Sequence, residues 1–440
     1  MPHGCLIGQF FCVDVRRGCI YFPKFIHLIW SSHLTCSELL RHGGFAMMDS
    51  SNDLLNSGSV ESVPLLDVGR GNAPLKAEIM ELFSDIYDSG WFIGGPHVKQ
   101  LEQSVAEATG AKYAVGCASG SDAILVALMA FDIKAGDSVI CPSFTFFATA
   151  SAIRRLGAQP VFVDIDPATF NLDVEQVKRA ITPKTKAIIP VHLFGQCADM
   201  DPIMELAKRF NIRVIEDCAQ SIGATYNRQG SGSIGDVGCF SFYPTKNLGG
   251  MGDAGIMTTN DADVADRLRL FANHGMKPRY YHEVIGINSR LDAMQAAVLN
   301  VKMKHLNQYG ADRRQNASNY QKLMTRHGIS DMVAAPGIEN EGHVWNQYTI
   351  RIPDGRRDEV RQQLADRNIG SEIYYPIPLH QQECFKDLGY KEGSLPHTEA
   401  AAAEVLSLPI FPELTFAEQT YVVESLADVV TGQQQVRKAA

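Results

Sequence analysis

Lys246 stands within the run C-F-S-F-Y-P-T-K-N-L, residues 239–248, among aromatic, proline and small polar residues. Burial in such a setting disfavours the ammonium form and lowers the pKa of a lysine. The neutral amine is the form that condenses with an aldehyde to give a Schiff base. The run therefore predicts covalent chemistry at Lys246, and the ordinary alternative is a partly exposed lysine that extends along apolar neighbours.

Asp217 closes the apolar segment R-V-I-E-D, residues 213–217, upstream of this lysine. The segment predicts a buried strand, and ligands of α/β sheets bind beyond the carboxyl ends of such strands. A carboxylate buried beside the pyridine nitrogen of pyridoxal phosphate (PLP) keeps that nitrogen protonated, which makes the cofactor an effective electron sink. The alternative is that Asp217 caps the next helix. Alternation along the strand turns Glu216 to the opposite face.

A phosphate site is indicated by A-S-G-S-D, residues 118–122, which runs into an apolar helical stretch at residues 123–131. A glycine and serine turn that opens a helix presents free N–H groups and the positive end of the helix dipole to an anion. Gly120 and Ser121 are the candidate phosphate contacts. Taken alone, the turn is equally typical of an ordinary helix N-cap.

A second glycine pattern, G-x-G-x-x-G at Gly250, Gly252 and Gly255, matches the dinucleotide-binding fingerprint by spacing alone. In a dinucleotide site this pattern follows a strand and opens a helix. Here it precedes a strand-like apolar run, residues 256–259. We therefore interpret these glycines as a flexible turn.

Short β-branched runs alternate with amphipathic helical patterns from about residue 110, which is typical of a doubly wound α/β fold. Because the runs lack polar alternation, we expect strands that are buried on both faces of a mostly parallel sheet. The predicted strands are residues 138–141, 160–164, 187–193 and 213–217. The predicted helices include residues 173–181 and 200–210.

The pattern changes after about residue 300, where residues 301–319 predict one long helix followed by a smaller α+β region. In that region we expect strands at residues 347–352 and 370–375 and helices at residues 358–366 and 416–430. Three parts are predicted: an N-terminal extension at residues 1–63, a large PLP-binding domain at residues 64–305 and a small C-terminal domain at residues 306–440.

The N-terminal extension includes a Ser/Asn-rich linker, residues 50–62. We expect the extension to be poorly ordered or absent from the native protein, with translation starting at Met47 or Met48. Its apolar stretch, residues 10–30, is too often interrupted by charge to be a membrane span of about 20 apolar residues.

The 440-residue chain has a formal net charge of −9 and a pI near 5.8. A field of this sign repels phosphate backbones and anionic lipid, so we expect neither nucleic acid nor membrane as a partner. The ten cysteines include no C-x-x-C pair. This spacing indicates reduced thiols in a cytoplasmic enzyme rather than a zinc site, and no metal is expected.

Five further segments stand in a fixed order along residues 64–430: P-S-F-T-F-F-A-T, I-I-P-V-H-L-F-G-Q, E-D-C-A-Q-S, S-F-Y-P-T-K-N-L and Y-H-E-V-I-G-I-N-S-R-L-D-A-M-Q-A-A. Together they resemble the DegT/DnrJ/StrS family of PLP-dependent nucleotide-sugar aminotransferases. The resemblance implies a type I, aspartate-aminotransferase-like fold. It also implies transfer of an amino group from an amino acid, by default glutamate, to a nucleotide-activated keto-sugar for amino-sugar, polysaccharide or antibiotic-sugar synthesis.

The resemblance implies roles for the residues that surround the cofactor ring. Lys246 matches the lysine that carries the cofactor and acts as general acid and base. Asp217 matches the partner of the pyridinium nitrogen. Gln220 matches the group that hydrogen-bonds the ring hydroxyl, and Phe146 matches the aromatic side chain that stacks on the ring.

Other matches concern the phosphate and the neighbouring subunit. The residues that match phosphate contacts are Gly120, Ser121 and Ser241. Asn288 matches a residue that reaches the phosphate of the neighbouring subunit, which implies a homodimer with shared active sites. His192 matches a histidine near the cofactor, but a buried histidine with satisfied hydrogen bonds fits its position equally well.

The sugar substrate is less constrained by the residues. A nucleotide diphosphate needs cationic or N–H contacts, for which the candidates are Lys277, Arg279, Arg290 and the turn at residues 94–95. Candidates for sugar or base contacts are Tyr280, Tyr281, His282, Tyr374 and Tyr375. Relatives that act on keto-uronates carry an arginine near the position of Val284. The absence of this arginine favours a neutral keto-sugar aminated at position 3 or 4.

Two alternatives to amino transfer follow from the same family. One branch performs PLP- or pyridoxamine-dependent dehydration of sugars with a histidine in place of the lysine, and the presence of Lys246 argues against it. Some members have been regarded as non-enzymatic regulatory proteins. A complete set of cofactor residues exceeds what such a binding role needs, and the acidic charge disfavours DNA.

Overall fold

The computed structural model describes residues 60–338 and 342–432. Of the extension predicted at residues 1–63, only residues 60–63 fall within this range, so the expectations about Met47, Met48 and a disordered N-terminus lie outside the described residues. Among the helices that are described, none is long and apolar enough to cross a membrane.

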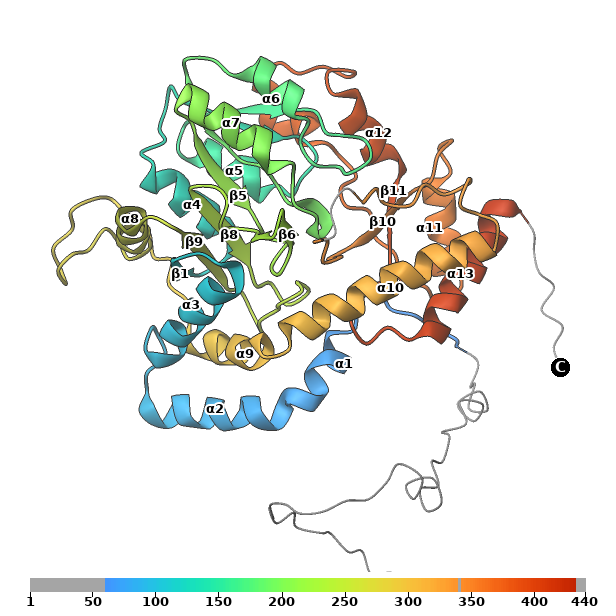
Figure 1. Ribbon diagram of the computed structural model, residues 1–440, viewed down its shortest axis with the longest axis horizontal. Coiled ribbons are helices and arrows are strands. Elements are labelled where there is room, and N and C mark those ends of the chain that lie inside the picture. Colours follow the sequence, from blue (N-terminus) through green and yellow to red (C-terminus); the bar gives the residue numbers. More distant parts are fainter. Residues whose placement is uncertain (1–59, 339–341, 433–440) are drawn as a thin grey trace, which may run out of the picture. The chain divides into compact units, whose positions relative to one another are not determined.

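A seven-stranded sheet lies at the centre of residues 64–305, the predicted large domain (Figure 1). Its strands are β1 (Tyr113–Cys117), β2 (Ser138–Pro142), β3 (Gln159–Val163), β4 (Thr185–Ile188), β5 (Arg213–Asp217), β8 (Val237–Ser241) and β9 (Gly255–Thr259). Their spatial order is β1-β9-β8-β5-β4-β2-β3. β9 runs antiparallel to β1 and β8, while the other neighbouring pairs are parallel. The predicted mostly parallel sheet is confirmed, and the carboxyl ends of all strands except β9 lie at one edge.

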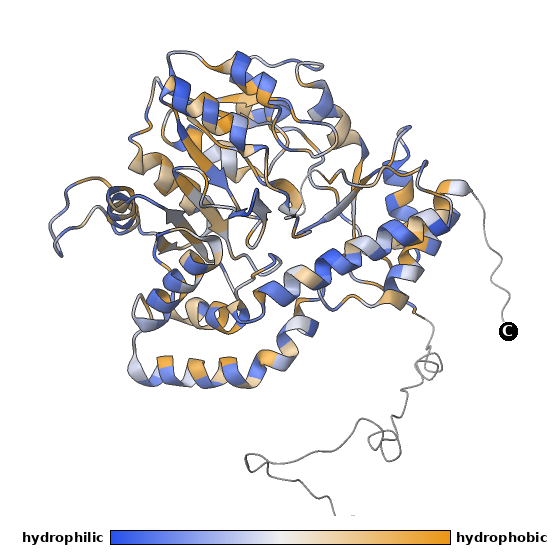
Figure 2. Cartoon of the chain, viewed as in Figure 1, coloured by the Kyte–Doolittle hydropathy of each residue, from blue (hydrophilic) through white to orange (hydrophobic). Residues whose placement is uncertain are grey.

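Helices cover both faces of this sheet. One face packs against α4 (Gly120–Ala130), α5 (Ala148–Arg155) and α8 (Ala262–Ala272). The other packs against α3 (Pro96–Thr109), α6 (Val174–Ala180), α7 (Met200–Phe210) and α9 (Ala293–Met303). Hydrophilic and hydrophobic residues alternate along the longer helices, as expected for elements with one buried side (Figure 2).

Local sequence explains where α4 begins and where α7 ends. The Ser119 side chain accepts a hydrogen bond from the backbone N–H of Asp122, which caps the start of α4. α7 has the predicted bounds, and Asn211 ends it in the left-handed conformation with φ of 54°. The structure thus confirms the βα rhythm of this part of the chain.

The long helix predicted at residues 301–319 is wrong as a single element. α9 ends at Met303, and α10 (Leu306–Arg326) begins after a short break. The two helices serve different cores, because Val298 and Val301 pack beside Ile79 whereas α10 contributes Tyr320 and Leu323 to the C-terminal core. Neither glycine nor proline marks the break, so the hydrophobic periodicity of the chain gave no sign that the helix is interrupted.

The small domain pairs β10 (Tyr348–Arg351) antiparallel with β11 (Val405–Leu408). It also contains α11 (Arg357–Ala365), α12 (Pro396–Glu404) and α13 (Phe416–Thr431). The strand predicted at residues 370–375 is wrong, since this segment forms only a bridge between Glu372 and Ser407. Pro376 follows the segment and has no N–H to extend the pairing.

The beginning of the described chain packs on the small domain as well as on the large one. Val63 is fully buried, and its backbone bonds to residues 368 and 370. α1 (Val68–Asn72) and α2 (Lys76–Ser89) follow. Val63 shares one hydrophobic core with Phe144 and Phe194 of the large domain and with Tyr320 and Tyr348 further along the chain. The domain boundary at residue 305 stays a prediction.

Candidate active site

The carboxyl ends of four strands bring most of the predicted site residues to one cavity. β5 ends at Asp217 and β8 ends at Ser241, while β1 leads to the start of α4 and β2 leads to a loop that ends at α5. The cavity encloses about 530 Å³. Its polar and aromatic lining residues include Ser119, Gly120, Ser121, Thr145, Phe146, Asp217, Gln220, Ser241, Lys246, Gln347, Tyr374 and Tyr375.

Asp217 is held by two hydrogen bonds at the end of β5. Thr149 donates its hydroxyl to Oδ2 at 2.8 Å, and the backbone N–H of Ala219 donates to Oδ1 at 3.2 Å. Only 4% of Asp217 is exposed. Burial raises the pKa of the Asp217 carboxyl, while these two donors and the charge of Lys246 act in the opposite direction. A positively charged group on the cavity side would form an ion pair with the Asp217 carboxylate.

Glu216 points to the other face of β5, as alternation predicts. Its carboxylate accepts hydrogen bonds from the backbone N–H groups of Gly232, Ile234 and Gly235. His192 supplies a fourth bond through Nε2 at 2.9 Å. Glu216 is therefore a buried structural carboxylate whose acceptor sites are already used.

His192 is fully buried and does not line the cavity. Its Nδ1 accepts a hydrogen bond from the backbone N–H of Ala198 at 3.1 Å, so Nε2 carries the proton that is donated to Glu216. Both ring nitrogens are satisfied within the protein. Of the two interpretations left open by the sequence, the geometry favours the buried histidine over a catalytic one.

Lys246 lies in the loop between β8 and β9 and lines the cavity together with Asp217. Burial lowers the pKa of Lys246 to about 8, and the charge of Asp217 opposes part of this effect. At pH 7 roughly one-tenth of Lys246 is then the free amine, far more than for an ordinary exposed lysine. A nucleophilic amine and a carboxylate in one cavity fit covalent capture of an aldehyde-bearing pyridine.

The rate at which cofactor-free protein captures PLP is expected to rise about tenfold per pH unit below pH 8 and to level off above it. The sign follows because only the neutral form of Lys246 attacks, and this form dominates above its pKa. Stopped-flow absorbance after mixing with PLP measures the rate. A capture rate that stays constant across this pH range would contradict the lowered pKa of Lys246.

The orientation of the Gln220 amide is set by the backbone. Its Oε1 accepts the N–H of Phe194 at 2.6 Å, so the NH₂ group is left to donate towards the Tyr375 hydroxyl, 3.4 Å away, and the cavity. Phe146 exposes 58% of its surface, and its ring lies 6.2 Å from that of Tyr375. An amide donor and an open aromatic face suit a hydroxylated aromatic ligand.

The start of α4 forms an anion cradle. The N–H groups of Gly120 and Ser121 lie in the first turn, where a helix offers them no acceptor of its own. Ser241 lies directly against this turn, because a Cβ built on Gly120 would stand 2.6 Å from the Ser241 Cβ. These N–H groups, the helix dipole and the serine hydroxyls fit a phosphate group.

Replacing Gly120 with alanine is expected to weaken PLP binding by about tenfold or more, because the new methyl group displaces Ser241 from the cradle. Absorbance-monitored titration of the cofactor-free variant measures the dissociation constant. Gly310 offers a matched control, since it lies within α10 and a Cβ there would meet only the end of the Arg314 side chain, at 3.3 Å. PLP affinity equal to that of the unaltered protein in Gly120→Ala would exclude the cradle.

The glycine pattern at Gly250, Gly252 and Gly255 is no dinucleotide site. Gly255 begins β9, so a strand rather than a helix follows the pattern. A Cβ on Gly255 would lie 2.5 Å from the carbonyl carbon of Ser119. This glycine therefore allows β9 to approach the backbone of the anion cradle.

Several sequence candidates lie outside the cavity. Asn288 is exposed, and Lys277 pairs with Asp266 at 3.3 Å. Arg279 stacks over the ring of Tyr280. Arg290 and the turn at residues 94–95 line a separate open groove. Of the predicted sugar contacts, Tyr374 and Tyr375 line the cavity. The single chain thus brings the predicted cofactor residues to one cavity except Asn288, but it does not bring the predicted nucleotide contacts there.

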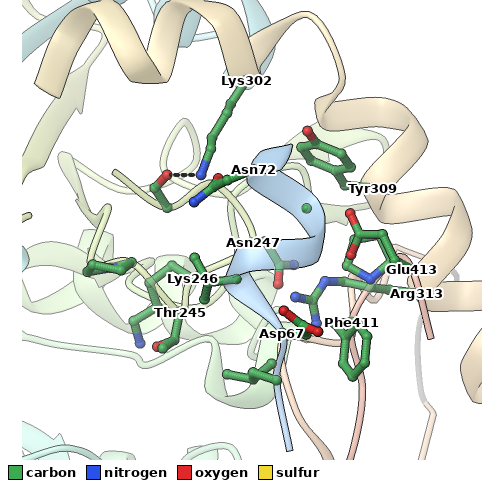
Figure 3. A pocket seen from close by; sticks show the side chains of 16 residues that line it. Asp67, Asn72, Thr245, Lys246, Asn247, Lys302, Tyr309, Arg313, Phe411 and Glu413 are labelled. Carbon is green, nitrogen blue, oxygen red and sulfur yellow. Dashed lines mark hydrogen bonds between the residues drawn. The ribbon is translucent and has the colours of Figure 1, made fainter. Parts of the chain in front are cut away.

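A smaller cavity of about 60 Å³ lies against the Lys246 loop, between α1 and the small domain (Figure 3). Lys302 donates to the Gly249 carbonyl oxygen at 2.7 Å, and Arg313 donates to the carbonyl oxygens of Trp345 and Ile410. Burial lowers the pKa of Lys302 and that of Arg313, the latter to about 10. These two cations support the loop and the C-terminal part of the chain without lining the larger cavity.

Comparison with known proteins agrees with this geometry. The chain is 51% identical over 368 residues to a pleiotropic regulatory protein of Geobacillus stearothermophilus, which covers 83% of this chain and 98% of that protein. It is 46% identical over 353 residues to a UDP-N-acetyl-3-dehydro-alpha-D-glucosamine 3-aminotransferase of Acidithiobacillus ferrooxidans, covering 80% of this chain and 94% of that protein.

A solved structure shares the fold. The crystal structure of DesV of S. venezuelae in complex with a ketimine intermediate has a TM-score of 0.80 and 38% sequence identity, and the match covers 84% of this chain and 98% of that one. Residues 74–427 match the DegT/DnrJ/EryC1/StrS aminotransferase family. PLP is the cofactor of this family, and the expectations of a type I fold and of a PLP-dependent enzyme are confirmed. The chain belongs to the DegT/DnrJ/EryC1/StrS aminotransferase family.

Proposed function

We propose that this chain transfers an amino group from an amino acid to a nucleotide-linked keto-sugar. The observation that carries the proposal is the shared cavity, which joins the low-pKa amine of Lys246, the carboxylate of Asp217 and the N–H cradle at Gly120 and Ser121. The names of the relatives from Acidithiobacillus ferrooxidans and other bacteria, among them a dTDP-amino-sugar transaminase, support the same activity.

Bound PLP supplies an aldehyde and a ring that withdraws electrons. Lys246 would hold this aldehyde and, when free, would move the proton at the substrate carbon that bears nitrogen. Asp217 would keep the proton on the ring nitrogen. Gln220 would donate its NH₂ group to a ring oxygen, and Phe146 would cover one face of the ring. Each role rests on the position of the side chain in the cavity.

For the substrate we propose a neutral UDP-linked 3-keto-sugar, with glutamate as the amino donor. The printed activity of the relative from Acidithiobacillus ferrooxidans supports amination at position 3 of a UDP-sugar. The side chain of Val284 offers no charge to a uronate carboxylate. The described part of the cavity lining contains Lys246 as its only lysine or arginine, which also suits an uncharged sugar ring.

We further propose a cytoplasmic homodimer. Tyr280, Tyr281 and Ile285 expose most of their surface on the segment that precedes Asn288, and a partner subunit would cover such apolar side chains. The nucleotide contacts that the cavity lacks would then come from the partner. In the described part of the chain the buried Cys117, Cys141, Cys218 and Cys239 are free thiols, as expected in a reducing compartment.

The test is a panel of nucleotide keto-sugars offered to the purified protein with glutamate and PLP. We expect the neutral UDP-3-keto-hexosamine to be aminated fastest, as followed by mass spectrometry of the product. Faster turnover of a UDP-keto-uronate would overturn the neutral substrate. PLP binding without amination of any sugar would favour the regulatory alternative, which the name of the Geobacillus relative also suggests.

A further inference from the structure

We propose that Thr149 is a positioning residue that, together with Thr145, holds the Asp217 carboxylate charged and aimed at the ring nitrogen of the cofactor. This inference rests on the proposed role of Asp217 and extends it to two hydroxyl groups behind that carboxylate. Thr149 lies in the first turn of α5, and Thr145 lies in the loop before this helix.

The geometry assigns a direction to each hydroxyl. Thr149 is fully buried, and its Oγ1 lies 2.8 Å from the Asp217 Oδ2. An ionised carboxylate only accepts hydrogen bonds, so the single proton of the Thr149 hydroxyl points at Asp217. The Thr145 Oγ1 lies 3.2 Å from that of Thr149 and must therefore be the donor in their shared bond. The chain Thr145–Thr149–Asp217 is thus polarised towards the carboxylate.

The energetic need for this chain comes from the burial of Asp217. Burial raises the pKa of its carboxyl, and the Thr149 hydroxyl is the strongest of the groups that oppose the rise. A neutral carboxylic acid cannot hold a pyridinium ion by charge. The charge of Lys246 also acts on Asp217, but Lys246 makes no hydrogen bond to this carboxylate among the described residues.

Thr349 provides a control from the same chain. It is also buried, and its hydroxyl is paired with that of Ser407 at 2.8 Å. It lies on β10 and does not line the cavity. Thr349→Val therefore removes a buried, hydrogen-bonded hydroxyl of the same type without touching Asp217.

The experiment compares Thr149→Val, Thr149→Ser and Thr349→Val as folded, cofactor-free proteins titrated with PLP. We expect Thr149→Val to bind PLP about tenfold more weakly, because it removes a hydrogen bond to a charged group. Thr149→Ser keeps the hydroxyl and is expected to restore binding to within about threefold. Thr349→Val is expected to bind as the unaltered protein does.

The pH dependence of PLP binding separates positioning from general stability. Without the Thr149 donor the pKa of Asp217 rises further, so the loss of PLP affinity on acidification is expected to begin at a higher pH than in the unaltered protein. The inference would be overturned if Thr149→Val lowered PLP affinity by the same factor at every pH, or if Thr349→Val lowered it equally. If Thr149→Val does not fold, Thr145→Val removes the outer hydroxyl alone and is expected to shift the same limb by a smaller amount.

Asp217→Asn distinguishes failure of this inference from failure of the proposed function. In Asp217→Asn, Thr149 no longer faces a carboxylate whose charge it can stabilise. Adding Thr149→Val to this variant is therefore expected to change PLP affinity less than twofold. Such non-additivity is typical of two residues that share a contact. Additive effects would overturn the role of Thr149 alone. An Asp217→Asn protein with unaltered PLP affinity and pH dependence would instead defeat the role of Asp217 on which the proposal rests.

Discussion

Exchange of Lys246 for alanine is expected to lower the rate of amino transfer by a factor of about 10³ or more, since one change removes both the covalent anchor and the general acid and base. The fold should survive because the side chain lines a cavity rather than a packed core. Initial rates measure the loss. Borohydride treatment followed by peptide mass spectrometry should find the cofactor fixed at Lys246 in the unaltered protein and at no residue of the variant.

Lys302 offers a control for this experiment because it is also a buried lysine with a lowered pKa. Its ammonium donates to the Gly249 carbonyl oxygen and does not line the larger cavity. Lys302→Met is therefore expected to keep the borohydride label at Lys246, with a loss of stability as its main effect. An active Lys246→Ala protein, or a label that moves to Lys302, would refute the assignment.

Exchange of Asp217 for asparagine is expected to lower the rate of amino transfer by about 10²- to 10³-fold, the range found when one preorganised electrostatic group is removed. Asparagine keeps the size of the side chain but loses the charge that holds a proton on the ring nitrogen. Single-turnover kinetics with glutamate, followed by absorbance, should show the loss in the proton-transfer step rather than in substrate binding.

Glu216 is the matched control for Asp217, since it is the adjacent residue of β5 and points the other way. Its carboxylate accepts three backbone N–H groups and the imidazole of His192, so Glu216→Gln is expected to lower the free energy of unfolding by about 2–4 kcal/mol. Thermal unfolding measures this change. If Glu216→Gln were stable but inactive while Asp217→Asn stayed active, Glu216 rather than Asp217 would be the carboxylate that serves the reaction.

Periodicity predicted most elements of the large domain because each has one clear environment, but the strand predicted at residues 187–193 is wrong beyond Ile188, where β4 ends. α7 matches its predicted bounds, and β5 does too. The pattern failed where tertiary packing divides a continuous signal, as between α9 and α10, and where a β-like segment had no partner strand, as at residues 370–375. Such outcomes depend on neighbours that the local sequence does not contain.

Site residues that stand within a distinctive sequence motif could be predicted, and site residues outside such motifs could not. Lys246, Asp217 and Gly120 stand in distinctive contexts, and the structure brings them to one cavity. Thr149 lies inside an ordinary helical stretch, so only the folded chain shows its bond to Asp217. The hydrogen bonds of His192 were likewise invisible, because Ala198 and Glu216 come from different segments.

The core that joins Val63 and Phe144 to Tyr320 and Tyr348 has a consequence for how the molecule comes apart. This core spans both predicted domains, so a cut at residue 305 would divide it and expose hydrophobic surface on both fragments. Heating should therefore unfold the two predicted domains together, in one cooperative step. Any opening of the active site must proceed by small sliding of packed side chains rather than by a free hinge.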